Sequence, residues 1–181
     1  YLGTDALAVY GIIINISTFV QCCAYSIGQA SQPMLSANFG AGKGKRIAQI
    51  LKYALGTAAV FGMVWTALAV FAPNLFVRIF MTPTEEILAI APDIICSYGI
   101  SFLLLPFNIF STYYFQALMR PMASFIVSVS RGAVVSGVLI YILPVVAGAD
   151  AIWFAMPVTE LLVAVYVTVK MVQYTKAVSD R

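Results

Sequence analysis

Five long apolar stretches constrain this chain more than any other feature of its sequence. A helix needs about 20 apolar residues to cross the ~30 Å hydrocarbon core of a bilayer, and each stretch is about that long or longer. Small, polar or proline-containing segments separate the stretches, which cover residues of about 6–37, 47–71, 93–118, 125–143 and 151–171. We therefore predict an all-α protein, a polytopic membrane bundle with five transmembrane helices.

The composition argues against an ordinary soluble domain. Of the 181 residues, 62% are apolar and only 9% are charged, whereas a typical soluble domain has about 25% charged residues. We therefore expect a lipid bilayer to be the solvent for most of the surface. The net charge of +3 is scattered along the chain, so we expect no nucleic-acid partner.

The sequence contains no histidine, which removes the common catalytic triads and HExxH zinc sites. We therefore predict no enzyme, no metal site and no cofactor.

The basic residues alternate between successive connections, and this pattern predicts an orientation in the membrane. The connection after the first stretch contains Lys43, Lys45 and Arg46, the one after the third contains Arg120, and the tail is also basic. Because cytoplasmic loops carry an excess of Lys and Arg, we expect these connections and the C-terminus to be cytoplasmic and Tyr1 to lie outside. The protein would then be a multi-pass protein of a bacterial inner membrane or plasma membrane, with an odd number of helices preceding this chain.

A segment of another kind joins the second and third stretches. Residues 73–92 contain short apolar patterns and several charges, which are typical of a segment lying at the membrane interface. Within it, Thr82, Pro83 and Glu85 match a capping box, with Thr82 as the N-cap of a new helix.

Polar side chains recur every three or four residues in the first stretch and therefore fall along one stripe of a helix. The stripe consists of Asn15, Thr18, Cys22, Tyr25, Gln29 and Gln32, with Gln21 beside it. Amides cost free energy in hydrocarbon unless they are partnered, so the stripe should face protein or a watery cavity. Two interpretations stay open: hydrogen bonds that hold helices together, or the wall of a solute pathway.

Two charges lie deep inside predicted spans. Glu160 is about 14 Å into the last span, near the bilayer midplane, and Arg131 is about 9 Å into the fourth span. A short loop joins these spans, so an Arg131–Glu160 pair is geometrically plausible. The pair is either a salt bridge that fixes two helices, or it gives Glu160 a role in coupling to a proton or ion.

Prolines lie inside three of the spans. Pro33, Pro106 and Pro157 each lack a backbone donor, so we expect each to kink its helix. Interrupted helices commonly line the binding sites of transporters. Proline is also tolerated in membrane helices without any such role, and both interpretations stay open.

In these details the sequence resembles the C-terminal half of the multidrug and toxic compound extrusion (MATE) transporters. The matching features are Gly28-Gln29-Ala30-Ser31-Gln32-Pro33 followed by Asn38-Phe39-Gly40-Ala41-Gly42, Tyr114-Phe115-Gln116-Ala117 before Pro121, Arg131, and Ile152-Trp153 with Pro157 and Glu160. The resemblance implies a twelve-helix fold with two six-helix lobes around a central cavity, in which this chain holds helices eight to twelve.

The resemblance also implies a function, namely export of cationic amphiphilic small molecules in exchange for Na⁺ or H⁺. The partners would be the N-terminal lobe and the lipid bilayer. We expect the solute-binding wall to consist of Asn15, Thr18, Gln21, Tyr25 and Gln29 from the first span and Asn108 from the third.

The sequence departs from the family pattern in its acidic residues. Some members have coupling acids in the seventh and tenth helices, but the third span here has no acid deeper than Asp93, so the coupling ion stays open. The alternatives are a related flippase for lipid-linked oligosaccharides, which should have more cationic residues facing its cavity, and a purely structural membrane subunit.

Overall fold

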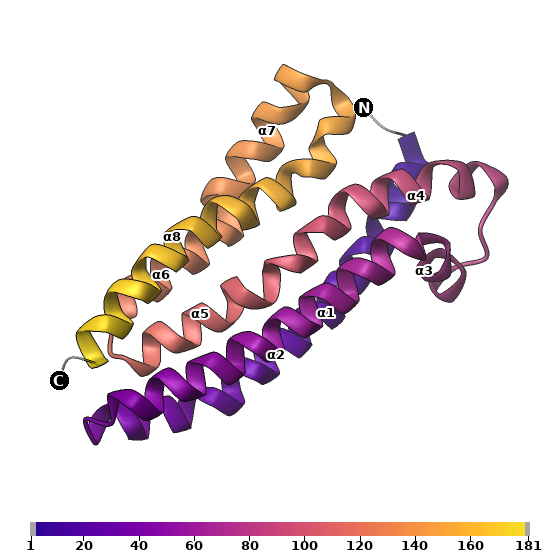
Figure 1. Cartoon of the computed structure of the whole chain (residues 1–181). Coiled ribbons are helices and arrows are strands. Elements are labelled where there is room, and N and C mark those ends of the chain that lie inside the picture. The colour runs from indigo at the N-terminus through magenta and orange to yellow at the C-terminus, as the bar shows by residue number, and fades with distance from the viewer. Residues whose placement is uncertain (1–2, 180–181) are drawn as a thin grey trace.

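The structure is a computed structural model that describes residues 3–179, and these residues are helical along almost their whole length (Figure 1). Within them, five helical segments are long and apolar enough to cross a membrane: Gly3–Gly40, Gly44–Phe71, Glu85–Ala117, Pro121–Ala147 and Ala149–Val178. The predicted all-α class with five membrane-spanning segments is thus confirmed. Tyr1, whose side of the membrane was predicted, lies outside the described residues.

Only the first two crossings are single helices. They are α1 (Gly3–Gly40) and α2 (Gly44–Phe71), and the short helix α3 (Pro73–Phe80) follows them. The third crossing consists of α4 (Glu85–Gly99), the 3₁₀ turn η1 (Ile100–Leu103) and α5 (Leu105–Ala117). The fourth consists of α6 (Pro121–Val129), the π-helical segment η2 (Ser130–Val134) and α7 (Val135–Ala147). The last consists of the 3₁₀ segment η3 (Ala149–Phe154) and α8 (Ala155–Ser179).

The helix α5 lies in the middle of the bundle and contacts α1, α2, α6 and α8. The antiparallel pair of α1 and α2 packs on one side of the third crossing, and the hairpin of the fourth and fifth crossings lies on the other side (Figure 1). At Gly62 the backbone of η1 approaches α2 so closely that a methyl group at position 62 would lie 2.7 Å from the carbonyl oxygen of Leu103. The glycine therefore allows the interrupted third crossing to pack against α2.

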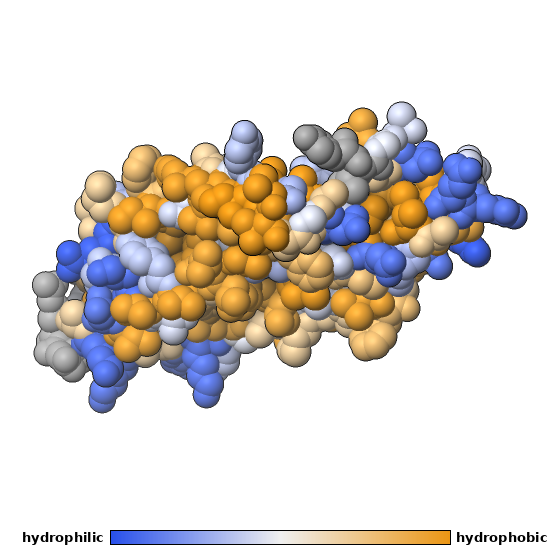
Figure 2. Space-filling view, turned by 90° about the horizontal axis from the view of Figure 1, so that it is seen from above, coloured by the Kyte–Doolittle hydropathy of each residue, from blue (hydrophilic) through white to orange (hydrophobic). Residues whose placement is uncertain are grey.

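Two groups of buried apolar side chains form the core, one toward each end of the bundle. The first includes Ile13 and Ile16 of α1 with Ile95 of α4 and Phe102 of η1. The second consists mainly of side chains from α2, α5, α6 and α8, and it includes Ile47, Phe110, Tyr114, Phe115 and Val167. Many large apolar side chains elsewhere are exposed, and apolar residues cover the middle of the face seen in Figure 2. Such an apolar surface matches the hydrocarbon core of a bilayer.

The charged residues lie near the two ends, apart from Arg131 and Glu160. The end with the α1–α2 turn and the C-terminal part of α8 has only basic residues among those the structure describes: Lys43, Lys45, Arg46, Lys52, Arg120, Lys170 and Lys176. The opposite end contains Asp5, Arg78, Glu85, Glu86, Asp93 and Asp150. Apart from Arg78, these charges are segregated by sign, which follows the alternation that the sequence shows from loop to loop.

The boundaries differ from the predicted ones mainly between the second and third crossings. The interfacial segment expected at 73–92 is divided, because α3 ends at Phe80 and the third crossing already begins at Glu85. The N-cap is Thr84, whose side chain accepts a hydrogen bond of 3.3 Å from the amide of Ile87, so the expected cap at Thr82 is wrong. This start places Glu85 and Glu86 in the first turn, where the helix dipole stabilises negative charge.

The three predicted kink positions have different surroundings. α1 continues past Pro33 without an interruption in its helical assignment. Pro106 lies in the first turn of α5, directly after the 3₁₀ turn η1, and Pro157 lies in the first turn of α8, after η3. The first turn of a helix tolerates proline because its amides have no helical partner there. Two of the three prolines therefore follow real interruptions of the α-helical path.

Candidate functional site

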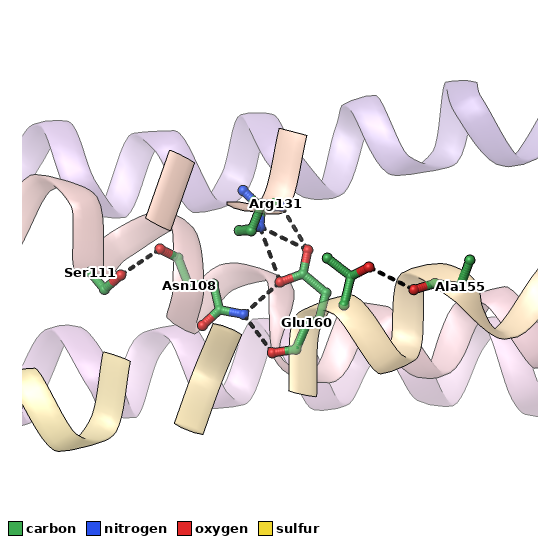
Figure 3. A network of polar contacts seen from close by, with 6 residues as sticks. Asn108, Ser111, Arg131, Ala155 and Glu160 are labelled. Atoms are coloured by element: carbon green, nitrogen blue, oxygen red, sulfur yellow. Dashed lines mark hydrogen bonds and ion pairs between the residues drawn. The ribbon is translucent and has the colours of Figure 1, made fainter. Parts of the chain in front are cut away.

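A buried carboxylate near the middle of the bundle joins three of the five crossings (Figure 3). Glu160 of α8 is fully buried, and its Oε1 lies 2.7 Å from Nη2 of Arg131, which comes from η2. Nε of Arg131 donates to both carboxylate oxygens, at 2.9 and 3.1 Å. Nδ2 of Asn108, on α5, donates to Oε2 at 2.6 Å and to the backbone carbonyl of Glu160 at 2.9 Å. We call these three residues the Glu160 cluster.

The local backbone explains how Arg131 reaches α8. Arg131 lies in the π-helical segment, and a π-bulge adds a residue to a helical turn and changes the direction of its side chains. Such bulges are frequent at functional sites. Gly132, next to it, has open space where a side chain would lie. On α8, the neighbour of Glu160, Thr159, is also buried and donates to the carbonyl of Ala155 at 2.7 Å.

The position of Asn108 differs from the expected one. It was predicted to join the solute-facing wall of the first span, yet its side chain is fully buried and donates to Glu160. The reason is that α5 is the central helix, so this face of α5 meets α8. Within the described residues, Oδ1 of Asn108 has no hydrogen-bond partner. Ser111 donates to the backbone carbonyl of Asn108 at 2.7 Å.

The predicted pair of Arg131 and Glu160 is therefore present, with a third member. Ionised carboxylates in a low-dielectric interior need both an opposite charge and hydrogen-bond donors. Here Glu160 accepts hydrogen bonds on both oxygens. The donors are the guanidinium group of Arg131, on the fourth crossing, and the amide of Asn108, on the third. The geometry complements a carboxylate, and it links the third, fourth and fifth crossings at one point.

The remaining predicted site residues lie on the outside of the five-crossing bundle. Asn15, Thr18, Tyr25 and Gln29 are exposed, and Gln21 is half-buried. We call these five residues the α1 polar face. Asn15 donates to the carbonyl of Gly11 and Thr18 to that of Ile14, both within α1. Among the residues that the structure describes, no member of this face forms a hydrogen bond to another helix.

An aromatic pair continues the α1 polar face onto α5. The rings of Tyr25 and Tyr113 lie edge to face with their centroids 6.4 Å apart. The ring of Tyr113 also covers Gly28, where even a methyl group would overlap it. Gly28 therefore allows Tyr113 to lie directly over α1. Tyr113 is not among the predicted site residues, although its neighbour Tyr114 belongs to a motif shared with the MATE transporters.

A hollow of about 440 Å³ lies between α1, α5 and the fourth crossing. It connects the two polar regions, because Gln21 and Tyr25 line it on one side and Arg131 on another. A second hollow, of about 450 Å³, lies toward the end where α1 begins and is lined by Tyr10 and Trp153, among others. Tyr98, Ile140 and Met156 line both hollows. The two hollows are therefore neighbours, with Tyr98 at their boundary.

Sequence reasoning missed several features of this region. The π-helical segment has no clear sequence signal beyond Gly132, and the role of Tyr98 depends on how α4 meets α1 and α7. Two buried hydroxyls, those of Ser17 and Ser101, have no hydrogen-bond partner in the part of the chain that the structure describes. In the sequence, Ser17 directly precedes Thr18 of the predicted stripe. This adjacency was the one sequence signal for a polar side chain at position 17.

Comparison with known proteins agrees with the fold and its five crossings. The family model MatE matches residues 1–142. A solved structure, described as an outward-facing multidrug resistance MATE family transporter of the MOP superfamily, matches with a TM-score of 0.88 and 15% sequence identity. The match covers 99% of this chain and 40% of that chain, so this chain spans well under half of the solved transporter.

No curated protein matches the chain. At 15% identity the solved structure shows the fold alone, whereas the family model covers most of the sequence. Together with five helices that can cross a membrane, this match identifies the family: the chain belongs to the MatE family.

Proposed function

We propose that this chain forms part of a secondary active transporter that exports organic cations in exchange for Na⁺ or H⁺. One observation carries the proposal: the α1 polar face is exposed and forms no hydrogen bond to another helix among the described residues. In a protein surrounded by lipid, a row of polar side chains without partners on other helices is unfavourable unless it faces water or another part of the protein. A watery path shared with the rest of the transporter meets this requirement.

The same observation bears on the alternatives. A structural subunit would use these amides as bonds between helices, and within this bundle the α1 polar face does not do so. A flippase for lipid-linked oligosaccharides would need several cationic side chains along its cavity, whereas Arg131 is the one charged residue lining the described hollow. Transport of a small amphiphilic solute therefore fits this surface better.

The shape of the path follows from the two neighbouring hollows. They lead from the acidic end of the bundle, past Tyr98, toward Arg131. In transporters of this architecture, alternating access arises when one half of the protein rocks against the other around a site near the midplane. We propose that the remainder of the transporter supplies the opposite wall. Tyr25 and Tyr113 would contact a cationic solute through their ring faces.

We assign the Glu160 cluster a positioning role within this mechanism. Both oxygens of Glu160 are already bonded to Arg131 and Asn108, so binding of a proton or Na⁺ there would require Arg131 to move away. The cluster fixes three crossings relative to one another and keeps Arg131 beside the hollow. Replacement by Glu160→Gln tests this assignment. If transport kept its rate but lost its dependence on the ion gradient, Glu160 would be the coupling residue instead.

The segregated charges support one orientation. We propose that the end with Lys43, Lys45 and Arg46 is cytoplasmic. The measurement is labelling by a membrane-impermeant thiol reagent in intact cells, in a variant whose three native cysteines are replaced. Asp150→Cys should be labelled from outside, and Lys45→Cys should be labelled only after the cells are permeabilised.

Efflux of a fluorescent cationic dye tests the function itself. Cells expressing the complete reading frame should lower their dye content under a Na⁺ or H⁺ gradient, and Gln21→Ala should change the order of preference among dyes. Thr57→Ala is a matched control, since Thr57 is an exposed polar residue on α2 that bonds only within its own helix. Absence of efflux under both gradients would exclude cation export.

A further inference from the structure

The hollow beside the Glu160 cluster has an unusual electrostatic character for a cation pathway. At about 440 Å³ it has the size of a small-molecule site. Glu160 is fully buried behind Arg131 and does not line it, whereas the side chain of Arg131 is 14% exposed. A solute that enters the hollow therefore meets a guanidinium group before it meets a carboxylate.

The guanidinium group has unused donors. Arginine carries five N–H bonds in a fixed plane, and Glu160 engages the one on Nε and one on Nη2. Within the described residues, the two N–H bonds of Nη1 and the second of Nη2 have no partner. One terminal nitrogen points away from Glu160 (Figure 3). The edge formed by Nη1 and Nη2 has the geometry that binds a carboxylate with two parallel hydrogen bonds.

The other polar groups around the hollow suit the same ligand. Gln21 contributes an amide, and Ser128 and Ser136 contribute hydroxyl groups. These groups can donate a hydrogen bond to an oxygen acceptor, whereas the hydroxyl of Thr112, which also lines the hollow, donates to the carbonyl of Ile109. No acidic side chain is found among the described residues that line the hollow, and the carboxylate of Glu160 lies behind Arg131, on the other edge of its guanidinium group.

We propose that this hollow binds the carboxylate group of a transported solute through the free edge of Arg131. The inference rests on the proposed transport function and narrows its substrate class. Solutes that carry a carboxylate in addition to a cationic centre should bind more tightly than the corresponding esters. In such a solute, the carboxylate contacts Arg131 and the cationic centre lies toward Tyr25, on the opposite wall of the hollow.

A matched pair of dyes tests the proposal directly. Rhodamine 110 carries a free carboxylate, and rhodamine 123 is its methyl ester with the same cationic ring system. Binding of each dye is measured by fluorescence polarisation on purified protein expressed from the complete reading frame. We expect rhodamine 110 to bind about tenfold more tightly, the effect expected of a charge-assisted hydrogen-bonded contact. Equal binding, or tighter binding of the ester, would overturn the proposal.

The variants separate the carboxylate site from the fold. Arg131→Lys keeps the positive charge opposite Glu160 but removes the planar second edge, so it should abolish the preference for rhodamine 110, measured as the ratio of the dissociation constants of the two dyes. Arg120→Lys, outside the hollow, is the matched control and should leave this ratio unchanged. Gly132→Val places atoms in open space at the lining of the hollow and should weaken binding of both dyes. A preference that survives Arg131→Lys would place the carboxylate elsewhere and refute the assignment.

The proposed function and this inference can fail separately. If the protein binds rhodamine 110 through Arg131 but exports no cationic dye, cation export is wrong and the carboxylate site stands. If it exports rhodamine 123 normally and Arg131→Lys affects both dyes equally, export stands and the carboxylate site is refuted.

Discussion

The Glu160 cluster and the α1 polar face are two polar regions of one apolar chain, but they differ in their hydrogen-bond partners. Every member of the Glu160 cluster bonds to a residue on another crossing. The hydrogen bonds found for the α1 polar face stay within α1. The first region is buried inside the bundle, and the second is largely exposed on its outside.

Polar side chains inside a membrane can therefore have two different roles. A buried polar group with partners on other helices contributes to the fold, and its removal leaves those partners uncompensated. A polar group whose partners lie only on its own helix contributes little to packing, so its presence in lipid requires another explanation. The two regions can be compared through the stability of the purified protein, measured by thermal unfolding, and through transport.

The largest effect is expected from breaking the ion pair. Arg131→Ala leaves the carboxylate of Glu160 buried without a counter-charge, which typically costs about 3–5 kcal/mol of folding free energy. The double variant Arg131→Met with Glu160→Leu removes both charges, and it should be markedly more stable than the single variant. If the single variant unfolded at the same temperature as the native protein, the ion pair would contribute nothing to the fold.

A smaller loss is expected at Asn108. Asn108→Leu keeps the volume of the side chain but removes a donor to a charged acceptor, which contributes about 1.5–3 kcal/mol. The lost acceptor Oδ1 has no partner in the described part of the chain, so its removal has no added cost. Ser111→Ala is the control, because Ser111 bonds only to its own helix and should cost about 1 kcal/mol or less. An Asn108→Leu variant as stable as the control would remove Asn108 from the Glu160 cluster.

Gly28 marks the place where α1 meets α5, between the two regions. Gly28→Ala puts a methyl group into the ring of Tyr113 and should destabilise the protein by about 1–3 kcal/mol, as overpacking does. Gly11→Ala on the same helix meets open space and should be neutral, or more stable by up to about 1 kcal/mol. If Gly28→Ala lowers the stability and Gly11→Ala does not, the close approach of Tyr113 to Gly28 is confirmed. Equal effects would show that Tyr113 does not lie over Gly28.

Much of the fold follows from the sequence because lipid imposes simple rules. The lengths of the apolar stretches and the signs of the loops predict five crossings, and the structure has them. The ion pair was also predictable, since two charges at membrane depth on adjacent spans need each other. The start of the third crossing was less predictable, because Thr82 and Thr84 are both acceptable N-cap residues. Only the packing of α3 and α4 selects Thr84.

The site was less predictable than the fold. Asn108 is polar and lies on a helical face shared with Ser101 and Thr112, and nothing in the pattern says that this face meets α8 rather than α1. The π-helical segment that aims Arg131 depends on tertiary contacts, which propensity does not encode. Tyr98 and Tyr113 are two of many aromatic residues in the sequence, so nothing distinguishes them there. Tyr98 lies beside the hollow and Tyr113 lies over Gly28 because of how three crossings meet.

The smallest effect on stability, and the one that separates the two regions most directly, is expected at Gln29. Because its side chain is exposed and forms no hydrogen bond among the described residues, Gln29→Ala should change the free energy of unfolding by no more than about 0.5 kcal/mol. The same variant should alter the relative efflux of cationic dyes, since the α1 polar face is proposed to contact the solute. A loss of stability as large as that of Asn108→Leu, with unchanged dye preference, would make Gln29 a packing residue against another part of the transporter. The two polar regions would then differ only in which helices they join, and not in their function.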